Sequence, residues 1–160
     1  MASFILFIIF KSRTLKTVLP DSHLTLHYRI SLENGQDIAN TFHTQPATLL
    51  LGQHQLAFSL EQNFLGMSEG QREHWTLAPL QAFGEYNPKL LQYVSWEAIR
   101  AGTKDDEPFL IGDWIELNTP EAVRMVGQLK SYDDQAVLLD FNHPLAGRTI
   151  QFEVQIIAIL

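Results

Sequence analysis

Apolar and polar residues alternate most regularly near the start and at the end of this chain. In residues 24–30, "LTLHYRI", four apolar positions share one face. A period of two is typical of a half-buried β-strand. At the other end Phe152, Val154, Ile156, Ala158 and Leu160 share one face, and Ile157 and Ile159 make the opposite face apolar too. We expect this last strand to be central in a sheet or covered on both sides.

The pattern predicts further elements between these two strands. Asn34-Gly35 is a strong hairpin signal. Residues 47–52, "ATLLLG", predict a strand that Gly52 ends. Residues 55–67, "QLAFSLEQNFLGM", place apolar side chains at helical spacing, and Gly66 is a helix stop signal. The apolar positions of this helix are Leu56, Leu60 and Phe64. Residues 72–80, "REHWTLAPL", alternate again and place Trp75 and Leu77 on one face.

A different pattern fills residues 87–141. "NPKLLQYVSWEAIRAG" predicts one or two short helices that begin at Asn87-Pro88. "DWIEL", "RMVGQLKSY" and "QAVLLDF" predict three strands, which the turns "NTPE" and "DD" separate. These elements indicate a second unit of about 55 residues, near the lower size limit for a separate core.

Composition excludes some chemistry. The chain has no cysteine, so it has neither disulfides nor thiolate nucleophiles or ligands. The net charge is −7, and the first sixteen residues hold three cations and no acid, which leaves −10 on the rest. Binding to phosphates requires clustered Lys and Arg. We therefore expect no nucleic-acid partner.

The N-terminus differs from the rest of the chain. Residues 4–10, "FILFIIF", are apolar, and the positive charges follow them instead of preceding them as in a secretory signal. A membrane helix needs about 20 apolar residues, so we expect no stable membrane insertion. Residues 1–19 are expected to be an extension outside the working domain, and an extra strand or a weak hydrophobic anchor remain alternatives.

Four stretches together resemble a known family: Gly52 in "LLLG", the helix "LEQNFLGMSEGQ", "APLQAFGEYNP" and "NHPLAGRTIQFEV". They are similar to FKBP-type peptidyl-prolyl isomerases of the prokaryotic SlyD/SlpA-like branch, and more so to SlpA. The resemblance covers about residues 20–160. It implies an α+β fold, with an FKBP-like bent antiparallel sheet around a short helix and a small, mostly β domain inserted in the flap. The implied domains are residues 20–86 with 142–160 for isomerisation and 87–141 for the insert.

The resemblance also implies an activity. It predicts a cytoplasmic peptidyl-prolyl cis-trans isomerase and folding helper that acts on X-Pro bonds of unfolded or nascent polypeptides. No cofactor is implied. The six histidines show no metal spacing, and the chain lacks the His-rich tail through which SlyD proteins bind nickel, so we expect no metal site. These histidines are His23, His27, His43, His54, His74 and His143.

The family's pocket residues can be carried over one at a time. The resemblance implies Tyr28, Phe83 and Phe152 as the catalytic residues. It implies seven further positions for substrate binding, which are Ile38, Ala39, Leu49, Leu56, Ala57, Leu60 and Leu145. At Leu56 and Ala57, the backbone is the part that commonly bonds to the substrate chain.

Two departures from the family pattern are expected to slow the reaction. Ala39 stands where the family usually has an acidic residue, and Phe83 stands where it usually has tyrosine. The alternative function is a non-enzymatic holdase or adaptor that binds hydrophobic segments with little turnover. Apolar residues of the insert are the candidates for client binding, although most must form its core; they are Leu90, Leu91, Tyr93, Val94, Trp96, Ile99, Met125, Val126 and Leu138.

Overall fold

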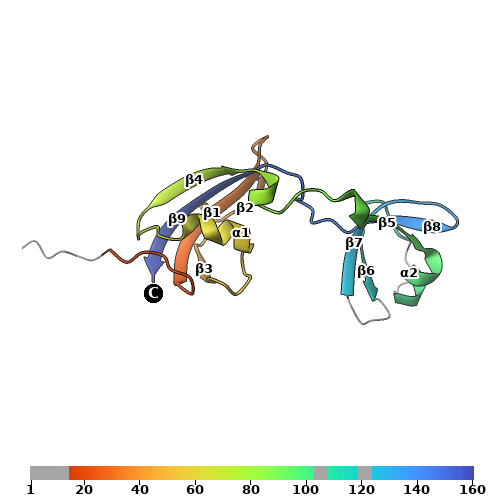
Figure 1. Ribbon diagram of the computed structural model, residues 1–160, viewed down its shortest axis with the longest axis horizontal. Helices are drawn as coiled ribbons and strands as arrows, with labels where there is room; N and C mark the ends of the chain where they lie inside the picture. The colour runs from red at the N-terminus through yellow and green to blue at the C-terminus, as the bar shows by residue number, and fades with distance from the viewer. Residues whose placement is uncertain (1–14, 103–107, 119–123) are drawn as a thin grey trace, which may run out of the picture. The chain divides into compact units, whose positions relative to one another are not determined.

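The chain forms two compact units. The computed structural model describes residues 15–102, 108–118 and 124–160. The first unit contains the residues up to Leu77 together with Thr149–Leu160, and the second contains Ala78–Arg148. The second unit is thus inserted in sequence between two strands of the first (Figure 1). The functional domain boundaries at residues 87 and 141 stay a prediction.

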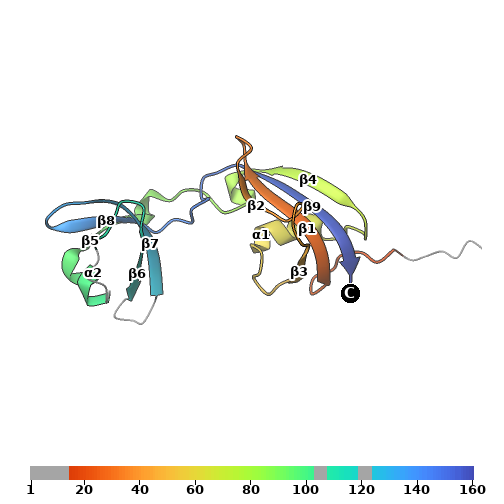
Figure 2. The same cartoon turned by 180° about the vertical axis from the view of Figure 1, so that it is seen from behind.

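The first unit is built on one five-stranded antiparallel sheet. Its order is β2-β1-β9-β4, and β3 pairs with the same strand β1. The strands are β1 His23–Leu32, β2 Asp37–Asn40, β3 Ala47–Leu50, β4 Arg72–Leu77 and β9 Ile150–Ile159. The last strand therefore lies between β1 and β4, as both views show (Figures 1 and 2). This confirms the prediction that the last strand is central, and it pairs with the first strand, β1.

A short helix lies against the inner face of this sheet (Figure 1). It consists of α1, Phe58–Glu61, followed by the 3₁₀ turn η1, Gln62–Phe64. Leu56, Leu60 and Phe64 are all buried, as their helical spacing predicts. Gly66 ends the segment with φ of +82°, a left-handed conformation that glycine adopts without steric cost. Burial of each such side chain stabilises the fold by about 1.5–3 kcal/mol.

One expectation about β9 is wrong, because the strand contains a β-bulge. Neighbouring residues Thr25 and Leu26 of β1 pair with Ala158 and Ile156, so Ile157 is an extra residue in β9. A bulge shifts the alternation by one position. Beyond Ile157 the side chains therefore exchange faces.

Exposure shows the exchange directly. Ile159 is 6% exposed and Leu160 is 71% exposed, whereas the uninterrupted pattern predicts the reverse. The opposite face is also not covered by a second layer, since Gln151, Glu153 and Gln155 on it are only half-buried. Apolar residues thus face only one side along most of the strand.

Part of the predicted N-terminal extension packs on the first unit. Val18 is 1% exposed, its N–H donates to the Met67 carbonyl at 2.8 Å, and its own carbonyl accepts from the Gly66 N–H at 2.8 Å. Val18 is therefore a core residue. The apolar run at residues 4–10 lies outside the described residues, and the functional role of the extension stays a prediction.

The second unit carries a four-stranded antiparallel sheet of order β5-β8-β7-β6. The strands are β5 Leu91–Ser95, β6 Trp114–Asn118, β7 Arg124–Tyr132 and β8 Ala136–Asp140. Strands β6, β7 and β8 confirm the three strands predicted from "DWIEL", "RMVGQLKSY" and "QAVLLDF". Helix α2 is Trp96–Gly102, and the 3₁₀ turns η2 Pro79–Gln81 and η3 Pro88–Leu90 precede the sheet in sequence.

The purely helical prediction for residues 87–102 is wrong in its middle. Asn87 does start a helical turn, because its side chain accepts a hydrogen bond from the Lys89 N–H. Residues Leu91–Ser95 then form β5, which pairs with β8 along its whole length. The pairing partner lies over 40 residues away, so tertiary contact overrides local propensity here.

The second unit has its own hydrophobic core, made of Ile99, Ile115, Leu129, Val137 and Leu139. Phe141 packs on its edge at a position where β7 carries no side chain. A Cβ added at Gly127 would lie 2.9 Å from Cε1 of Phe141, closer than real contacts allow. Glycine is therefore needed at position 127, because a side chain there would collide with the Phe141 ring.

Candidate functional site

Tyr28 is held on β1 by Thr41. The Tyr28 N–H donates to Thr41 Oγ1 at 2.9 Å, and the Thr41 N–H donates to the Tyr28 carbonyl at 2.9 Å. Tyr28 lies two positions from buried Leu26 and Ile30, so its half-buried ring faces the inside of the sheet. Within the described residues, no hydrogen bond involves the Tyr28 hydroxyl. The backbone of Tyr28 is thus held by Thr41, while its hydroxyl is available to a ligand.

Four apolar residues form what we call the floor cluster of the first unit: Leu60, Phe64, Trp75 and Phe152. The Phe152 ring centroid lies 6.3 Å from that of Phe64 and 5.7 Å from that of Trp75. Leu60 and Phe152 have no exposed surface. Trp75 is half-buried and pairs with Phe152 across β4 and β9. Phe152 is fully buried, and its predicted catalytic role stays a prediction.

The loop before α1 presents unpaired backbone donors. Leu56 is buried and Ala57 is half-buried. The Ala57 carbonyl accepts from the N–H groups of Leu60 and Glu61 at 2.9 and 3.1 Å. In the part of the chain that the structure describes, the N–H groups of Leu56 and Ala57 make no hydrogen bond. Such donors need a partner, and a substrate carbonyl can supply one.

Two predicted substrate-binding residues on strand β2, Ala39 and Ile38, differ in their burial. Ala39 pairs with buried Ile30 of β1, so its side chain lies on the inner face of the sheet. Ile38 is 44% exposed. Leu49, on β3, pairs with Leu24 and is buried.

Asp37 does not replace the acidic group missing at Ala39. Asn40 Nδ2 donates to Asp37 Oδ2 at 2.9 Å, and Arg29 Nε donates to Asp37 Oδ1 at 2.6 Å. These hydrogen bonds, first from Asn40 and then from Arg29, hold the pKa of Asp37 below its usual value. The carboxylate is therefore engaged by exposed polar groups of the outer face.

In the second unit, Phe83 stacks on His143. The ring centroids are 4.6 Å apart and the rings are nearly parallel, at 5°. The Leu145 N–H donates to His143 Nδ1 at 3.1 Å, which requires that nitrogen to be unprotonated. Burial lowers the pKa of His143, in agreement with a neutral ring. This contact orients the half-buried Phe83 ring.

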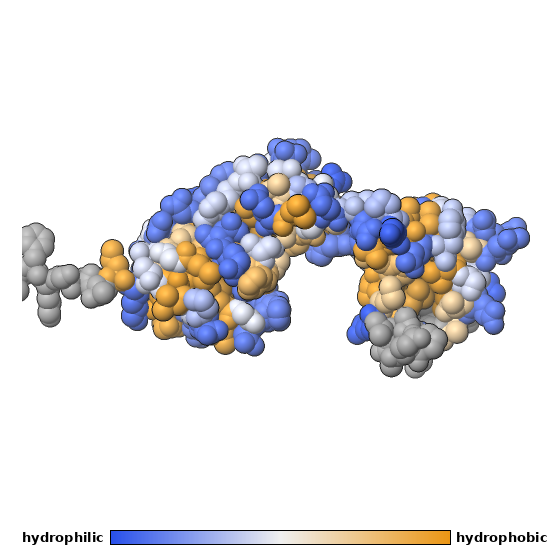
Figure 3. Space-filling model, in the orientation of Figure 1, coloured by the Kyte–Doolittle hydropathy of each residue, from blue (hydrophilic) through white to orange (hydrophobic). Residues whose placement is uncertain are grey.

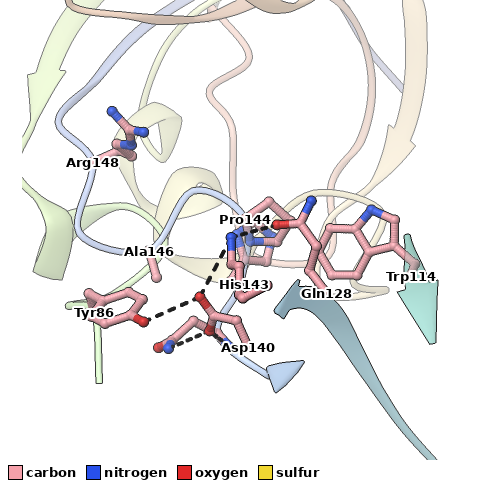
Figure 4. A pocket seen from close by; sticks show the side chains of 10 residues that line it. Tyr86, Trp114, Gln128, Asp140, His143, Pro144, Ala146 and Arg148 are labelled. Carbon is pink, nitrogen blue, oxygen red and sulfur yellow. Dashed lines mark hydrogen bonds and ion pairs between the residues drawn. The ribbon is translucent and has the colours of Figure 1, made fainter. Parts of the chain in front are cut away.

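A hydrogen-bonded group of Tyr86, Asn87, Asp140 and Asn142, which we call the Asp140 network, joins two segments of the second unit that lie far apart in sequence (Figure 4). The Tyr86 hydroxyl donates to Asp140 Oδ2 at 3.3 Å, and Asn142 Nδ2 donates to Asp140 Oδ1 at 2.8 Å. The Asn87 N–H donates to Asn142 Oδ1 at 2.9 Å, and Asn142 Nδ2 also donates to the Asn87 carbonyl at 3.0 Å. The network borders a hollow of about 190 Å³, which Trp114 and Pro144 also line.

Asp140 remains ionised in this network despite its burial. Burial alone would raise the pKa of Asp140, but hydrogen bonds from Asn142 and Tyr86 and the nearby Lys130 lower it below its ordinary value. Lys130 Nζ lies 4.0 Å from Asp140 Oδ2. The pKa of the Tyr86 hydroxyl shifts in the opposite direction: burial, and then the charge of Asp140, raise it above its ordinary value.

The predicted site residues divide between the two units. Tyr28, Phe152 and most of the predicted substrate-binding residues belong to the first unit, whereas Phe83 and Leu145 belong to the second. Trp75 and His143 are two residues near the predicted site that the sequence did not indicate as part of it. For Trp75 the signal was its predicted place on one face with Leu77; for His143 no sequence signal indicated the stack on Phe83.

Exposed apolar residues gather on the second unit, and Figure 3 shows an extensive apolar patch there. Among the candidate client residues, Leu91, Tyr93 and Val126 are exposed. Ile99 is buried in the core, and Val94 and Trp96 pack against it, so these three serve the unit's own stability. Four further exposed residues of this unit were not among the predicted candidates; they are Leu110, Ile111, Trp114 and Tyr132.

Among the described residues, no group of three or more His, Cys, Asp or Glu side chains is arranged to hold a metal ion. Within the same part of the chain, no helix has the length and apolar character needed to span a bilayer.

The first unit is thus a curved antiparallel sheet around one short helix, with an apolar floor and few polar groups. The second unit interrupts the chain just before the central strand of this sheet. The chain matches the family of FKBP-type peptidyl-prolyl cis-trans isomerases over residues 16–157, and it belongs to this family. As the family's name states, its activity is isomerisation of peptidyl-prolyl bonds. This confirms the resemblance found in the sequence.

Three relatives in sequence agree with this assignment. The chain is 32% identical to a probable FKBP-type 16 kDa isomerase of Pseudomonas fluorescens, covering 86% of this chain and 88% of that one. It is 31% identical to the FKBP-type 16 kDa isomerase of Escherichia coli K12, covering 90% and 95%. It is 34% identical to SlyD of Aeromonas hydrophila, covering 87% of this chain and 63% of that relative. Among solved structures, AtFKBP13 matches with a TM-score of 0.49 and 12% identity over 92% of this chain and 86% of that one.

Proposed function

We propose that the first unit isomerises X-Pro bonds of unfolded or nascent polypeptides by removing water from the prolyl amide and favouring its twisted form. The barrier in solution is amide resonance, about 18–20 kcal/mol. The planar amide is more polar than the twisted one, so an apolar surface destabilises the ground state relative to the transition state. No nucleophile, metal or general base takes part in this mechanism.

One observation carries this proposal: an apolar floor beside unpaired hydrogen-bond donors in the first unit. The floor cluster is largely buried, and Tyr28 adds a half-buried aromatic ring on the inner face. The N–H groups of Leu56 and Ala57 remain unbonded within the described residues. In the proposal, the prolyl ring lies on the half-buried rings of Tyr28 and Trp75, which the buried residues of the floor cluster support, and a carbonyl of the substrate accepts from these donors.

The other predicted residues are proposed to border the site and to contact substrate around the prolyl ring. Phe83 and Leu145 of the second unit are proposed to contact substrate, and His143 orients the Phe83 ring. Ala39 and Ile38 are proposed to border the prolyl site from β2. With no acidic group at Ala39 and no hydroxyl at Phe83, the rate comes mainly from desolvation.

We also propose that the second unit retains unfolded clients. Its exposed Tyr93, Trp114 and Val126 would contact apolar segments, since exposed apolar patches of this kind mark interaction surfaces. Cytoplasmic location is part of this proposal, because nascent chains are present there. The second candidate function is a holdase or adaptor without turnover, and the missing polar groups at Ala39 and Phe83 favour it.

A protease-free assay separates the two functions. The exchange rate between cis and trans forms of a proline tetrapeptide is measured by NMR with and without the full chain. Isomerase activity predicts exchange that accelerates in proportion to the concentration of the chain. An unchanged exchange rate, with suppression of the aggregation of an unfolded protein, would establish the holdase instead.

A further inference from the structure

Glu61 is a buried carboxylate that the proposed mechanism does not use. It is the last residue of α1 and is 3% exposed. Its Oε2 accepts a hydrogen bond from the Gly52 N–H at 3.0 Å, whereas its Oε1 is buried and has no hydrogen-bond partner within the described residues. Burying a carboxylate with a single hydrogen bond is unfavourable, so this arrangement calls for a physical explanation.

The loop between β3 and α1, residues 51–57, is tied at both ends to this one residue. The Glu61 N–H donates to the Ala57 carbonyl at 3.1 Å, and the Glu61 carboxylate accepts from the Gly52 N–H. Gly52 has φ of +81°, a conformation that other residues adopt only with strain. Glu61 therefore fixes the start of the loop relative to its end.

The rest of the loop has few other restraints. Leu51 and Leu56 are buried, but residues 53–55 between them are exposed. Gln55 contributes a second tie, because its Oε1 accepts from the Leu50 N–H at 2.9 Å. His54 has φ of +58°, which is uncommon for a residue with a side chain. Without the bond to Gly52, the loop would lose the tie between its first turn and the helix.

We infer that Glu61 is a positioning residue, which holds the unpaired N–H groups of Leu56 and Ala57 where a substrate carbonyl meets them. The inference rests on the proposed function of this site. Glu61 does not touch the substrate; it acts through Gly52 and the loop.

The test compares three substitutions in the full chain. Glu61→Gln keeps an oxygen that can accept from Gly52. Glu61→Asp keeps the charge but withdraws it by one methylene, and Glu61→Met removes the acceptor at nearly unchanged length. Glu33→Met, at an exposed position of the β1–β2 turn, is the matched control. Measurements are kcat and KM on a proline tetrapeptide, hydrogen exchange of the Gly52 amide, and urea unfolding.

Glu61→Asp and Glu61→Met should raise KM by about tenfold with kcat nearly unchanged, since they weaken binding equally in ground and transition states. Exchange at Gly52 should accelerate in both. Glu61→Gln should restore slow exchange and a KM near that of the wild type. Should Glu61→Met fail to fold, the comparison of Asp with Gln decides the same question.

An Asp or Met variant that is folded, exchanges Gly52 rapidly and keeps the wild-type KM would overturn the inference. A wild-type chain without turnover would instead overturn the proposed isomerase function. In that case the tetrapeptide is titrated while the amide resonances of Leu56 and Ala57 are followed. Weaker binding by Glu61→Asp then supports the positioning role, and equal binding refutes it.

Discussion

At the scale of single residues, Ala39 is the position where a small change tests the mechanism most directly. It lies opposite Ile30 on the inner face of the sheet, on the side toward which Tyr28 also points. We predict that Ala39→Asp raises kcat/KM on a proline tetrapeptide, because a carboxylate there stabilises the twisted amide. Each tenfold gain corresponds to about 1.4 kcal/mol of the barrier. Ala39→Asn, of equal size but uncharged, is the control and should give a smaller gain.

Phe152 tests the floor cluster. Because it is fully buried against Phe64 and Trp75, Phe152→Ala should lower the free energy of unfolding by about 3–5 kcal/mol, as measured in urea. Ile157→Ala on the same strand is the control, since Ile157 is 43% exposed and should matter far less. Turnover per folded Phe152→Ala molecule should also fall. Unchanged turnover would remove Phe152 from the site while leaving it in the core.

His143 predicts a pH effect on stability. Burial lowers its pKa below the ordinary 6.5 in the folded chain, so the unfolded chain binds more protons as the pH falls below about 6.5. His143 therefore stabilises the fold fully above that pH, and its contribution is lost as the pH falls through the lowered value. His143→Asn can still accept the Leu145 N–H but does not titrate. Urea unfolding at pH 5 to 7 should show a shallower decline for this variant.

At the scale of elements, the packing of β7 against Phe141 depends on the absence of a side chain at Gly127. We predict that Gly127→Ala lowers the free energy of unfolding of the second unit by about 1–3 kcal/mol, because Phe141 must move. Ser131→Ala, at an exposed position of the same strand, should have little effect.

A double substitution tests the cause. Phe141→Leu removes the ring atoms that the new methyl group meets, so Gly127→Ala should cost less in that background. Equal costs in both backgrounds would mean that the loss comes from the backbone of β7 and not from contact with Phe141.

At the scale of the whole molecule, the first unit should fold without most of the second. The segments at the junction are already close, since the Gly147 N–H donates to the Gly84 carbonyl at 2.8 Å and Asn142 bonds to Asn87. We predict that replacing residues 87–141 by a short loop leaves a folded sheet, because β1 and β9 pair without them. Activity on a tetrapeptide should survive in part, and activity on an unfolded protein should fall much further. Equal losses on both substrates would contradict separate roles for the two units.

Much of the first unit could be predicted from local pattern. The strands at residues 24–30 and 72–77, the helix with Leu60 and Phe64, and the turn at Asn34-Gly35 all follow from periodicity and glycine placement. Strand β5 could not be predicted from local pattern, because its conformation depends on pairing with β8, far away in the sequence. The bulge at Ile157 could not be predicted either, because assigning alternate residues to opposite faces assumes that the strand contains no extra residue.

The sequence by itself determined the family, the α+β class and the apolar faces of the strands and the helix, because apolar side chains at regular spacing must be buried together. Only the tertiary structure decided which polar groups are paired. The bonds of Asp37 to Arg29 and Asn40, the stack of Phe83 on His143 and the tie from Glu61 to Gly52 depend on distances between segments. Directional contacts of this kind require coordinates, whereas burial requires only a pattern.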